Sequence, residues 1–430
     1  MHAKNLINTM QDPSVRTLHS ELTWKVPAPS VGNGARHAAF LLMAAYIWFL
    51  PLRHTIAVRN LAFFPLVILT LWAGSRREGL RLRIPFLWAW AVYGVVALAS
   101  LTYAIHPLYS IGQIKEQIGY ALLVLLIFTS WVNGPSEFSK LMRIIVAGVT
   151  LMIGYSLLNS FVLSPFWHSD FRLHQGSLAD GFGTFSTYLI TTLPLVVTSM
   201  WVLPRTARLK RAALALLITG GLVALYLTGN REGALALGGE LVVAAALVCA
   251  TKPGVCRNRK VIALGAITGI FCVAFFARLL EVREPLATDP RTTLIWPLAL
   301  HNITAEPFTG GGFGIQAFKM RNPAFCHAYS TFSHAHNMIL NKGVQMGIPG
   351  VLAFLVLWFG AIRAIWPDRN LAKMNSPVWA YLVAGVAMSA GVFLKNMTDD
   401  FFVNDGAFLY WLLIGALIGM RSAPHDEWTP

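Results

Sequence analysis

Apolar segments of roughly twenty residues recur along almost the whole chain, and no other feature of the sequence limits its fold so strongly. Each segment is long enough, or nearly so, to cross about 30 Å of hydrocarbon as an α-helix. Membrane strands would be shorter and would alternate polar with apolar residues, which these segments do not. Only 12% of the 430 residues are charged, against about 25% in soluble domains. The sequence therefore predicts an all-α, polytopic membrane protein.

We expect about twelve transmembrane helices, of which 117–132 and 405–421 are the weakest candidates. The expected spans are 37–52, 56–74, 84–103, 117–132, 142–163, 184–203, 211–228, 233–250, 261–280, 347–366, 378–395 and 405–421. They divide the chain into an N-terminal arm at 1–36, spans one to nine within 37–280, a large loop with short helices at 281–346, spans ten to twelve within 347–421 and a tail at 422–430.

The basic residues are divided unequally between alternate connections, and this division predicts the orientation of the chain. If the N-terminus is cytoplasmic, most of the 34 Lys and Arg residues fall in cytoplasmic segments. Such an excess is typical of the cytoplasmic side of membrane proteins. We therefore expect both termini to be cytoplasmic, with the large loop on the other face. The net charge of +15 is explained in this way and does not indicate nucleic-acid binding.

Polar segments on the face opposite the basic connections could meet at one cavity. Besides the large loop, these segments are 164–183, 228–233 and 395–405. Within the loop, Asp289 followed by Pro290 is typical of a helix start, so a short helix should carry Arg291. The glycine run 310–314 lacks the lysine and the preceding strand of a phosphate-binding loop. We expect it to form a flexible turn at which the loop could hinge.

His334, His336 and Asn337 stand together at the end of this loop, just before a hydrophobic span. Ionisable groups at membrane depth are costly and indicate a site. Histidine exchanges a proton near neutral pH, so one imidazole could act as a general base on a substrate hydroxyl. Asp399 or Asp400 could orient that imidazole and stabilise its charged form.

Other interpretations of the same residues stay open. Either histidine could bond only to loop backbone, or the pair could bind a metal ion together with a third ligand, for which no regular spacing is present. Asp399 and Asp400 could form a proton or sodium site in a carrier. Few acidic residues lie within the spans, which argues against a proton-coupled carrier.

Two arginines, Arg231 and Arg291, are candidates for contact with an anion, with Arg172 as a speculative third. The guanidinium group is planar, always charged and suited to phosphate oxygens. Arg231 could instead extend from a span end towards water, and Arg291 could pair with Asp289 or Glu284 on a helix surface.

Taken in order, these elements resemble those of the O-antigen ligase family, within the superfamily of O-antigen polymerases and bacterial O-oligosaccharyltransferases. The resemblance covers roughly 225–355 closely and the rest by topology. It rests on Thr228-Gly229-Asn230-Arg231, on Arg291, Trp296, Pro307 and Gly310 to Gly314, and on His334-Ala335-His336-Asn337 with Leu340 and Gly347-Ile348-Pro349-Gly350.

Two departures from the family pattern bear on the site. Asn230 and Glu232 stand where the family more often has serine and a small residue, so Glu232 could partly neutralise Arg231. The family's key histidine directly precedes asparagine, which favours His336 over His334.

The resemblance implies a GT-C-type helical glycosyltransferase at the periplasmic face of a Gram-negative inner membrane, metal-independent and without a cofactor. The donor would be a polysaccharide on undecaprenyl diphosphate, and the acceptor a sugar hydroxyl of lipid A–core, with membrane lipids around the spans. His336 would be the base, oriented by Asp399 or Asp400, with His334 and Asn337 in support. The diphosphate contacts would come from Arg231, Arg291 and Arg172.

Attack from the face opposite the diphosphate would invert the anomeric centre. An O-antigen polymerase or a protein O-oligosaccharyltransferase would share this chemistry and remains an alternative. A carrier of lipid-linked glycan, which cleaves no bond, is the alternative from another class.

Overall fold

The computed structural model describes residues 32–422 apart from 53, 76–79, 81, 83, 164–180, 257–288, 331 and 374–375. Every regular element within these ranges is helical, and they contain no strand. The expectation of an all-α membrane protein is therefore confirmed. The expected span 261–280, Arg172, most of the arm 1–36 and all but the first residue of the tail 422–430 lie outside the described residues.

The helices of the first half follow the predicted apolar segments. They are α3 (Asn33–Phe49), α4 (Ile56–Ser75), α5 (Leu87–Ala99) with η1 (Ser100–Thr102), α6 (Pro107–Ile114), η2 (Lys115–Tyr120), α7 (Ala121–Trp131), α8 (Pro135–Leu158) with η3 (Asn159–Leu163), α9 (Phe182–Val202), α10 (Arg208–Leu227), α11 (Arg231–Thr251) and α12 (Pro253–Cys256).

The second half contains the short helices of the large loop, three long helices and the short helix α18. They are η4 (Arg291–Ile295), α14 (Trp296–Ala305), α15 (Ala317–Arg321), α16 (Pro323–Ala328), α17 (Met338–Ala364), α18 (Arg369–Lys373), α19 (Pro377–Lys395) and α20 (Asn404–Arg421).

Eight helical stretches in the described part are long and apolar enough to cross a membrane. They are Ile56–Ser75, Pro107–Trp131, Pro135–Val162, Phe182–Val202, Arg208–Leu227, Arg231–Thr251, Met338–Lys373 and Pro377–Lys395. The stretch Leu87–Thr102 is apolar but shorter, and α3 and α20 coincide with the first and last expected spans. The count of twelve spans and the GT-C fold stay predictions.

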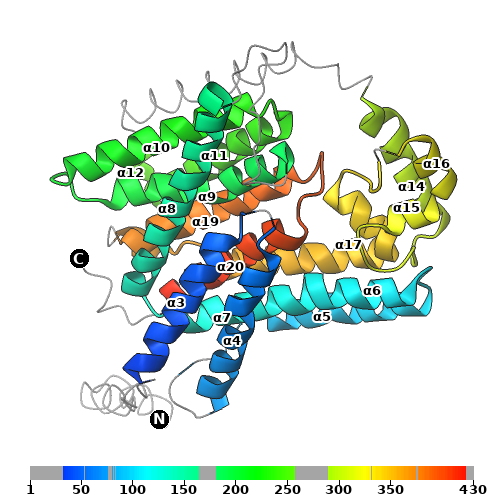
Figure 1. Cartoon of the computed structure of the whole chain (residues 1–430), viewed down its shortest axis with the longest axis horizontal. Coiled ribbons are helices and arrows are strands. Elements are labelled where there is room, and N and C mark those ends of the chain that lie inside the picture. Colours follow the sequence, from blue (N-terminus) through cyan, green and yellow to red (C-terminus); the bar gives the residue numbers. More distant parts are fainter. Residues whose placement is uncertain are drawn as a thin grey trace, which may run out of the picture.

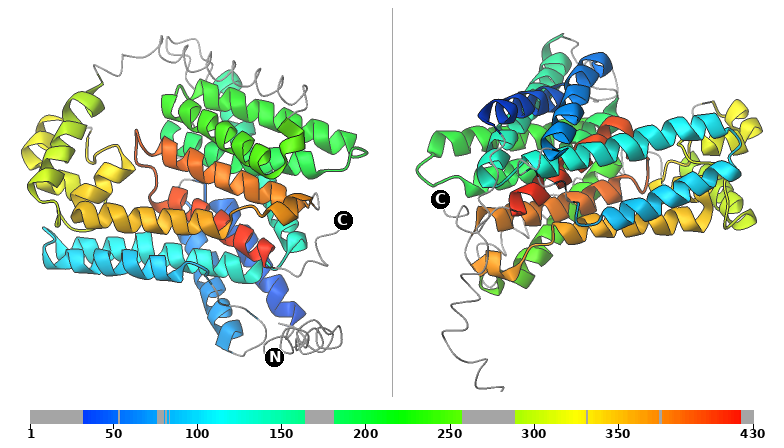
Figure 2. Two further views of the ribbon diagram at one scale, coloured as in Figure 1. Left: turned by 180° about the vertical axis from the view of Figure 1, so that it is seen from behind. Right: turned by 90° about the horizontal axis from the view of Figure 1, so that it is seen from below.

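The short helices α14, α15 and α16 gather at the end of the molecule where α17 begins (Figure 1). From there α17 runs beside α5, as both views of Figure 2 show. On the other side, α11 packs along α19 and α9. The large loop thus sits on one end of a helical body, and the chain enters that body through α17.

The glycine run 310–314 is packed against α17, which differs from the expected free turn. Gly347 breaks the helical course of α17 with φ 65°, so nearby carbonyls lose their partners along the helix. The amide of Gly311 donates to Val344 O at 2.9 Å, and that of Gly312 donates to Gln345 O at 3.1 Å. A Cβ added at Gly310 would lie 2.5 Å from the backbone of Gln345. Gly310 is a glycine because two backbones meet there, whereas a Cβ at Gly312 would lie 2.5 Å from Ala104 Cβ and one at Gly314 would lie 2.6 Å from the Tyr109 ring.

Helix α20 forms the centre of the body, with nearly every side chain buried from Leu409 to Met420. It packs closely on α7, where a Cβ added at Gly415 would lie 2.7 Å from Leu125 O and 3.1 Å from Phe128 Cβ. Small residues allow membrane helices to approach in this way. This contact fixes the position of α20. It thereby also fixes the loop before α20, which carries Asp399 and Asp400.

We expect Gly415→Ala to lower the thermal unfolding temperature of the purified protein in detergent. The added methyl group overpacks the α7–α20 contact, and overpacking typically costs about 1–3 kcal/mol. Gly94→Ala is the matched control, because nothing lies within 4 Å of a Cβ built there and alanine favours a helix by up to about 1 kcal/mol. Equal unfolding temperatures for the two variants would contradict this close contact.

A candidate active site at the start of helix α17

The segment that carries the two histidines is anchored by the residue between them. Ala335 is fully buried in a small apolar cluster with Ile295, Phe318 and Val344. This cluster joins α14, α15 and the first turns of α17 around the loop. His334 and His336 flank the anchor, and their rings stack with centroids 3.9 Å apart. The loop therefore presents both imidazoles as one fixed pair.

Asn337 begins α17 and ties it to the loop that follows α19. Its Oδ1 accepts hydrogen bonds from the amides of Ile339 at 2.9 Å and Leu340 at 3.0 Å, which are the unpaired donors of a helix start. Its Nδ2 donates to Met397 O at 2.6 Å, and the Met338 amide donates to the backbone of Asn396 at 2.7 Å. The side-chain amide of Asn337 thus joins two segments of the site. This contact is compatible with the supporting role predicted for it.

Asp400 faces Asn341, one turn into α17. The Asn341 Nδ2 donates to Asp400 Oδ2 at 2.7 Å, and Asn341 Oδ1 accepts from the Ala335 amide at 2.8 Å. Asp400 Oδ1 also accepts from the Phe402 amide at 3.2 Å. Sequence reasoning missed Asn341, although a polar amide inside an apolar helix was a usable signal. Asp400 and Asn341 shape the loop that carries Asp399.

Asp399 is the carboxylate that meets the histidines. The Nδ1 of His336 lies 2.9 Å from Asp399 Oδ1, and the Nε2 of His334 lies 3.4 Å from the same oxygen. The backbone of His336 has φ 47°, a left-handed conformation that side chains other than glycine rarely adopt. Its Nε2 is buried and makes no hydrogen bond among the described residues. A non-glycine residue in this conformation, with an unpaired ring nitrogen, is typical of a functional position.

The surroundings of His336 and Asp399 give these two groups different charges near pH 7. Burial lowers the pKa of His336 below its ordinary value of 6.5, and the hydrogen bond to Asp399 opposes this only in part. Burial alone would raise the pKa of Asp399, but hydrogen bonds from His334 and His336 and the charge of Arg291 bring it below its usual range. Near pH 7 Asp399 is therefore ionised and His336 neutral. Its Nδ1 then donates to Asp399, which leaves the lone pair on Nε2.

Two of the three predicted arginines reach this carboxylate cluster. The Nη1 of Arg291 lies 2.6 Å from Glu232 Oε1 and donates to Thr398 O at 3.0 Å, while its Nη2 lies 3.9 Å from Asp399 Oδ2. Arg231 pairs with Asp289 at 3.2 Å. The other oxygen of Asp289 accepts from the backbone amide of Arg291 at 2.9 Å, as the expected helix start requires. The segments 228–233, 289–291 and 395–400 therefore meet, while residues 164–180 of the fourth expected polar segment lie outside the described residues.

Lys395, at the end of α19, belongs to the same cluster. Its side chain is fully buried, and its Nζ lies 4.6 Å from the centroid of the Phe401 ring. The charges of Glu232, Asp399 and Arg291 all act on it. The sequence analysis gave this lysine no role. A lysine at the end of an apolar span, four residues before Asp399, was the available signal.

The same residues offer donor atoms to a metal ion. One ligand atom each from His334, His336 and Asp399 lie within 4.8 Å of one another. Two imidazole nitrogens and a carboxylate oxygen are a donor set that suits zinc. The expectation of a metal-independent site stays a prediction and is tested by chelation below.

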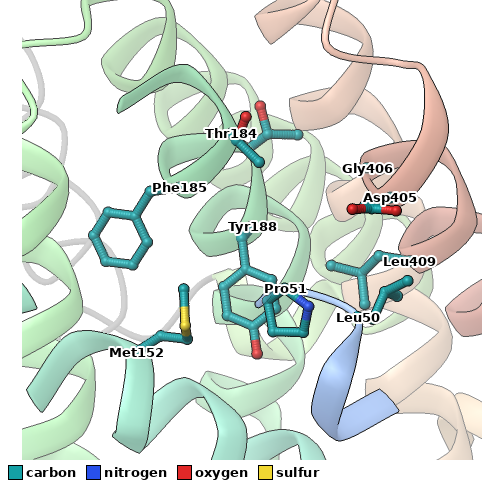
Figure 3. A pocket seen from close by; sticks show the side chains of 10 residues that line it. Leu50, Pro51, Met152, Thr184, Phe185, Tyr188, Asp405, Gly406 and Leu409 are labelled. Atoms are coloured by element: carbon teal, nitrogen blue, oxygen red, sulfur yellow. The ribbon is translucent and has the colours of Figure 1, made fainter. Parts of the chain in front are cut away.

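A separate cavity lies at the first turns of α20, the helix that follows this loop. Side chains from α8, α9, α20 and the turn after α3 converge on it (Figure 3). Its lining includes Met152, Tyr188 and Leu409, together with Asp405, whose carboxylate pairs with Arg59 of α4. Asp405 thus lines this apolar cavity, whereas Asp399 and Asp400 serve the histidine site.

Comparison with known proteins supports the family resemblance. Residues 182–355 match the model of the O-antigen ligase family. A protein of Rickettsia felis named "Putative polysaccharide ligase" is 26% identical over 168 residues, which cover 36% of this chain and 40% of that relative. The match thus spans less than half the relative's length. The family is confirmed over 182–355, the region that holds Arg231, Arg291 and His336.

Replacement of Asp399 should change the titration of His336. We expect Asp399→Asn to lower the pKa of His336 further, because it removes both the hydrogen bond from an ionised carboxylate and its negative charge. Modification by diethyl pyrocarbonate, which needs the neutral imidazole, would then persist to lower pH. Fragment-ion mass spectrometry distinguishes His336 from His334.

Asp400→Asn is the control for this experiment. Asp400 contacts Asn341 and backbone, so its replacement should leave the titration of His336 near that of the unchanged protein. Equal shifts in both variants would contradict the assignment of Asp399 as the partner of His336.

Proposed function

We propose that this membrane protein, whose residues 182–355 carry an O-antigen ligase domain, transfers a polysaccharide from undecaprenyl diphosphate to a sugar hydroxyl of lipid A–core. One observation carries the proposal. A neutral histidine with an unpaired Nε2 is held by an ionised aspartate, and that aspartate also contacts an arginine. This arrangement supports a reaction in which a base and a cationic group act together, as transfer from a lipid diphosphate would require.

In the proposed reaction, His336 Nε2 removes the proton from the acceptor hydroxyl as that oxygen attacks the anomeric carbon. The bond between this carbon and the diphosphate oxygen breaks, and the diphosphate leaves with the electron pair. Asp399 fixes the tautomer of His336 and stabilises the imidazolium that forms. A positioned base typically contributes about 10²–10⁴-fold to the rate. Attack from the face opposite the diphosphate inverts the anomeric configuration.

Arg291 and Arg231 would stabilise the charge that develops on the leaving diphosphate. Arg291 is tied to the base through Asp399, so the anion and the acceptor hydroxyl would meet at one place. Arg172 is proposed as a third contact. His334 supports the site through its stacking on His336 and its bond to Asp399.

The proposal extends to location and cofactor. The cluster joins the start of η4, the loop before α17, the start of α11 and the end of α19, and the distribution of basic residues would place this face in the periplasm of a Gram-negative cell. Both termini would then be cytoplasmic in the inner membrane. The reaction would need no metal ion, because His336 and the arginines supply the base and the countercharge.

A sister reaction remains open. A polymerase would use the same base and arginines to join two lipid-linked chains, and an O-oligosaccharyltransferase would modify a protein hydroxyl. A carrier would have no use for a neutral, aspartate-bound histidine whose second nitrogen is unpaired, which favours an enzyme.

A reconstituted reaction tests the proposal. Purified protein is mixed with undecaprenyl-diphosphate-linked glycan and lipid A–core in EDTA, and the lipid A–core products are separated by mass. We expect a high-mass ladder from the unchanged protein and its loss in His336→Ala, because the general base is missing. His301→Ala is the matched control, since His301 is an exposed histidine of the same loop.

Each other product of this reaction has a defined meaning. Longer lipid-linked chains without a lipid A–core product would establish a polymerase. A ladder from His336→Ala would overturn the base assignment, and activity that EDTA abolishes and zinc restores would overturn metal independence. Transport without any transfer product would establish the carrier.

Arg291→Lys should reduce kcat/KM by roughly tenfold or more, equivalent to about 1.4 kcal/mol. The guanidinium reaches Glu232, Thr398 and Asp399 from two nitrogens, and a single ammonium cannot reproduce this fork. Arg321→Lys is the control, because Arg321 pairs with Glu306 and has no part in the proposed site. Equal kcat/KM values for the two variants and the unchanged protein would assign Arg291 a structural role.

A further inference from the structure

The cations of the site are balanced by carboxylates before any substrate is present. Among the described residues, Arg231 pairs with Asp289, and Arg291 lies between Glu232 and Asp399. An incoming diphosphate must therefore compete with carboxylates for the arginines. The site needs a means of holding the displaced carboxylate, because an unpaired buried charge is costly.

Lys395 is the cation of this cluster whose ammonium is not engaged. The structure gives its Nζ no hydrogen-bond partner among the described residues, and its side chain is 0% exposed. Its Nζ lies over the face of the Phe401 ring, 4.6 Å from the ring centroid. Buried polar atoms are nearly always hydrogen-bonded, so an exception calls for a functional explanation.

The neighbours of Lys395 are the same carboxylates that hold Arg291. Burial disfavours the charged ammonium form of Lys395, the charges of Glu232 and Asp399 favour it, and the charge of Arg291 opposes it. Glu232 lies in the first turn of α11 and Lys395 in the last turn of α19. These two helices run side by side (Figure 2), and Leu394 of α19 contacts Gly239 of α11. Glu232 and Lys395 therefore act on each other electrostatically across the contact between the two helices.

We propose that Lys395 is a positioning residue that receives Glu232 when Arg291 turns to the diphosphate of the lipid donor. The inference rests on the proposed function and deepens it. Before binding, Glu232 holds Arg291 in place. As a phosphate oxygen takes the guanidinium, Glu232 transfers its ion pair to Lys395, and no buried charge is left without a partner.

The proposal also explains why a glutamate is tolerated beside the candidate arginines. Among the described residues of these ion pairs, Lys395 brings the cations to three, equal to the number of carboxylates. Without Lys395 these described residues would carry one net negative charge, which would oppose the approach of an anion. Glu232 and Lys395 would then act as a pair whose members must be changed together.

Binding of farnesyl diphosphate, a short polyprenyl diphosphate, tests this directly. Its Kd is measured with the full-length protein in nanodiscs, so that no transfer reaction is needed. We expect Lys395→Met to weaken binding roughly tenfold, because the cluster becomes negative while the shape of the side chain is kept. Glu232→Gln should bind at least as tightly as the unchanged protein. The double variant Glu232→Gln with Lys395→Met should recover most of the lost affinity.

Lys342→Met is the matched control. Lys342 is another buried lysine, lying over the rings of Phe313 and Phe354, and the proposal gives it no part in diphosphate binding. Its replacement should leave the Kd within about twofold of the original.

The outcomes separate this inference from the proposed function. Tight binding by the unchanged protein, with no weakening in Lys395→Met, would overturn the role of Lys395 and leave the donor assignment intact. Weakening that Glu232→Gln does not reverse would show that Lys395 only supports the fold, and would also overturn the inference. A failure of the unchanged protein to bind any diphosphate would contradict the donor class and this inference with it.

Discussion

Ionised groups in a closed, apolar surrounding need charged or hydrogen-bonding partners. In the candidate site, Asp399 is the shared partner of several such groups. Its carboxylate contacts the His336 and His334 rings and lies near the Arg291 guanidinium. One negative charge therefore sets the tautomer of the base and draws in the group proposed to bind the anion. Because these contacts come from the loop before α17, from η4 and from the loop after α19, this one carboxylate joins three separate segments of the chain.

The asparagines around this charge have a different task, which is to hold backbone. Asn337 and Asn341 together satisfy the start of α17, the Ala335 amide and the side chain of Asp400. None of these contacts needs a titratable group on the asparagine itself. An amide can both donate and accept, so it can join a helix start to a neighbouring loop without adding charge. The reactive geometry is thus supported by neutral groups.

Much of this arrangement could be predicted from the sequence. The apolar segments located the helices, and Asp289 and Pro290 marked the start of η4. The polar residues of 228–233 and 395–405 were expected to meet the loop, but Asp405 lines a different cavity. The choice between Asp399 and Asp400 could not be made, because adjacent residues differ only in the direction that the chain gives their side chains. The role of 310–314 was also missed, since a glycine run alone does not show that another backbone fills the space beside it. Lys395 went unassigned because its burial depends on the packing of α11 against α19.

Helix α17 changes course at Gly347, and this break separates the turns beside the site from the long apolar part of the helix. The glycine run holds the residues before the break, and the carbonyl of Pro307 accepts from the amide of Ile348, directly after the break, at 2.7 Å. The loop thus contacts the helix backbone on both sides of the bend. The angle between the two parts of α17 is therefore set by the loop that carries the histidines, and not by the apolar segment alone.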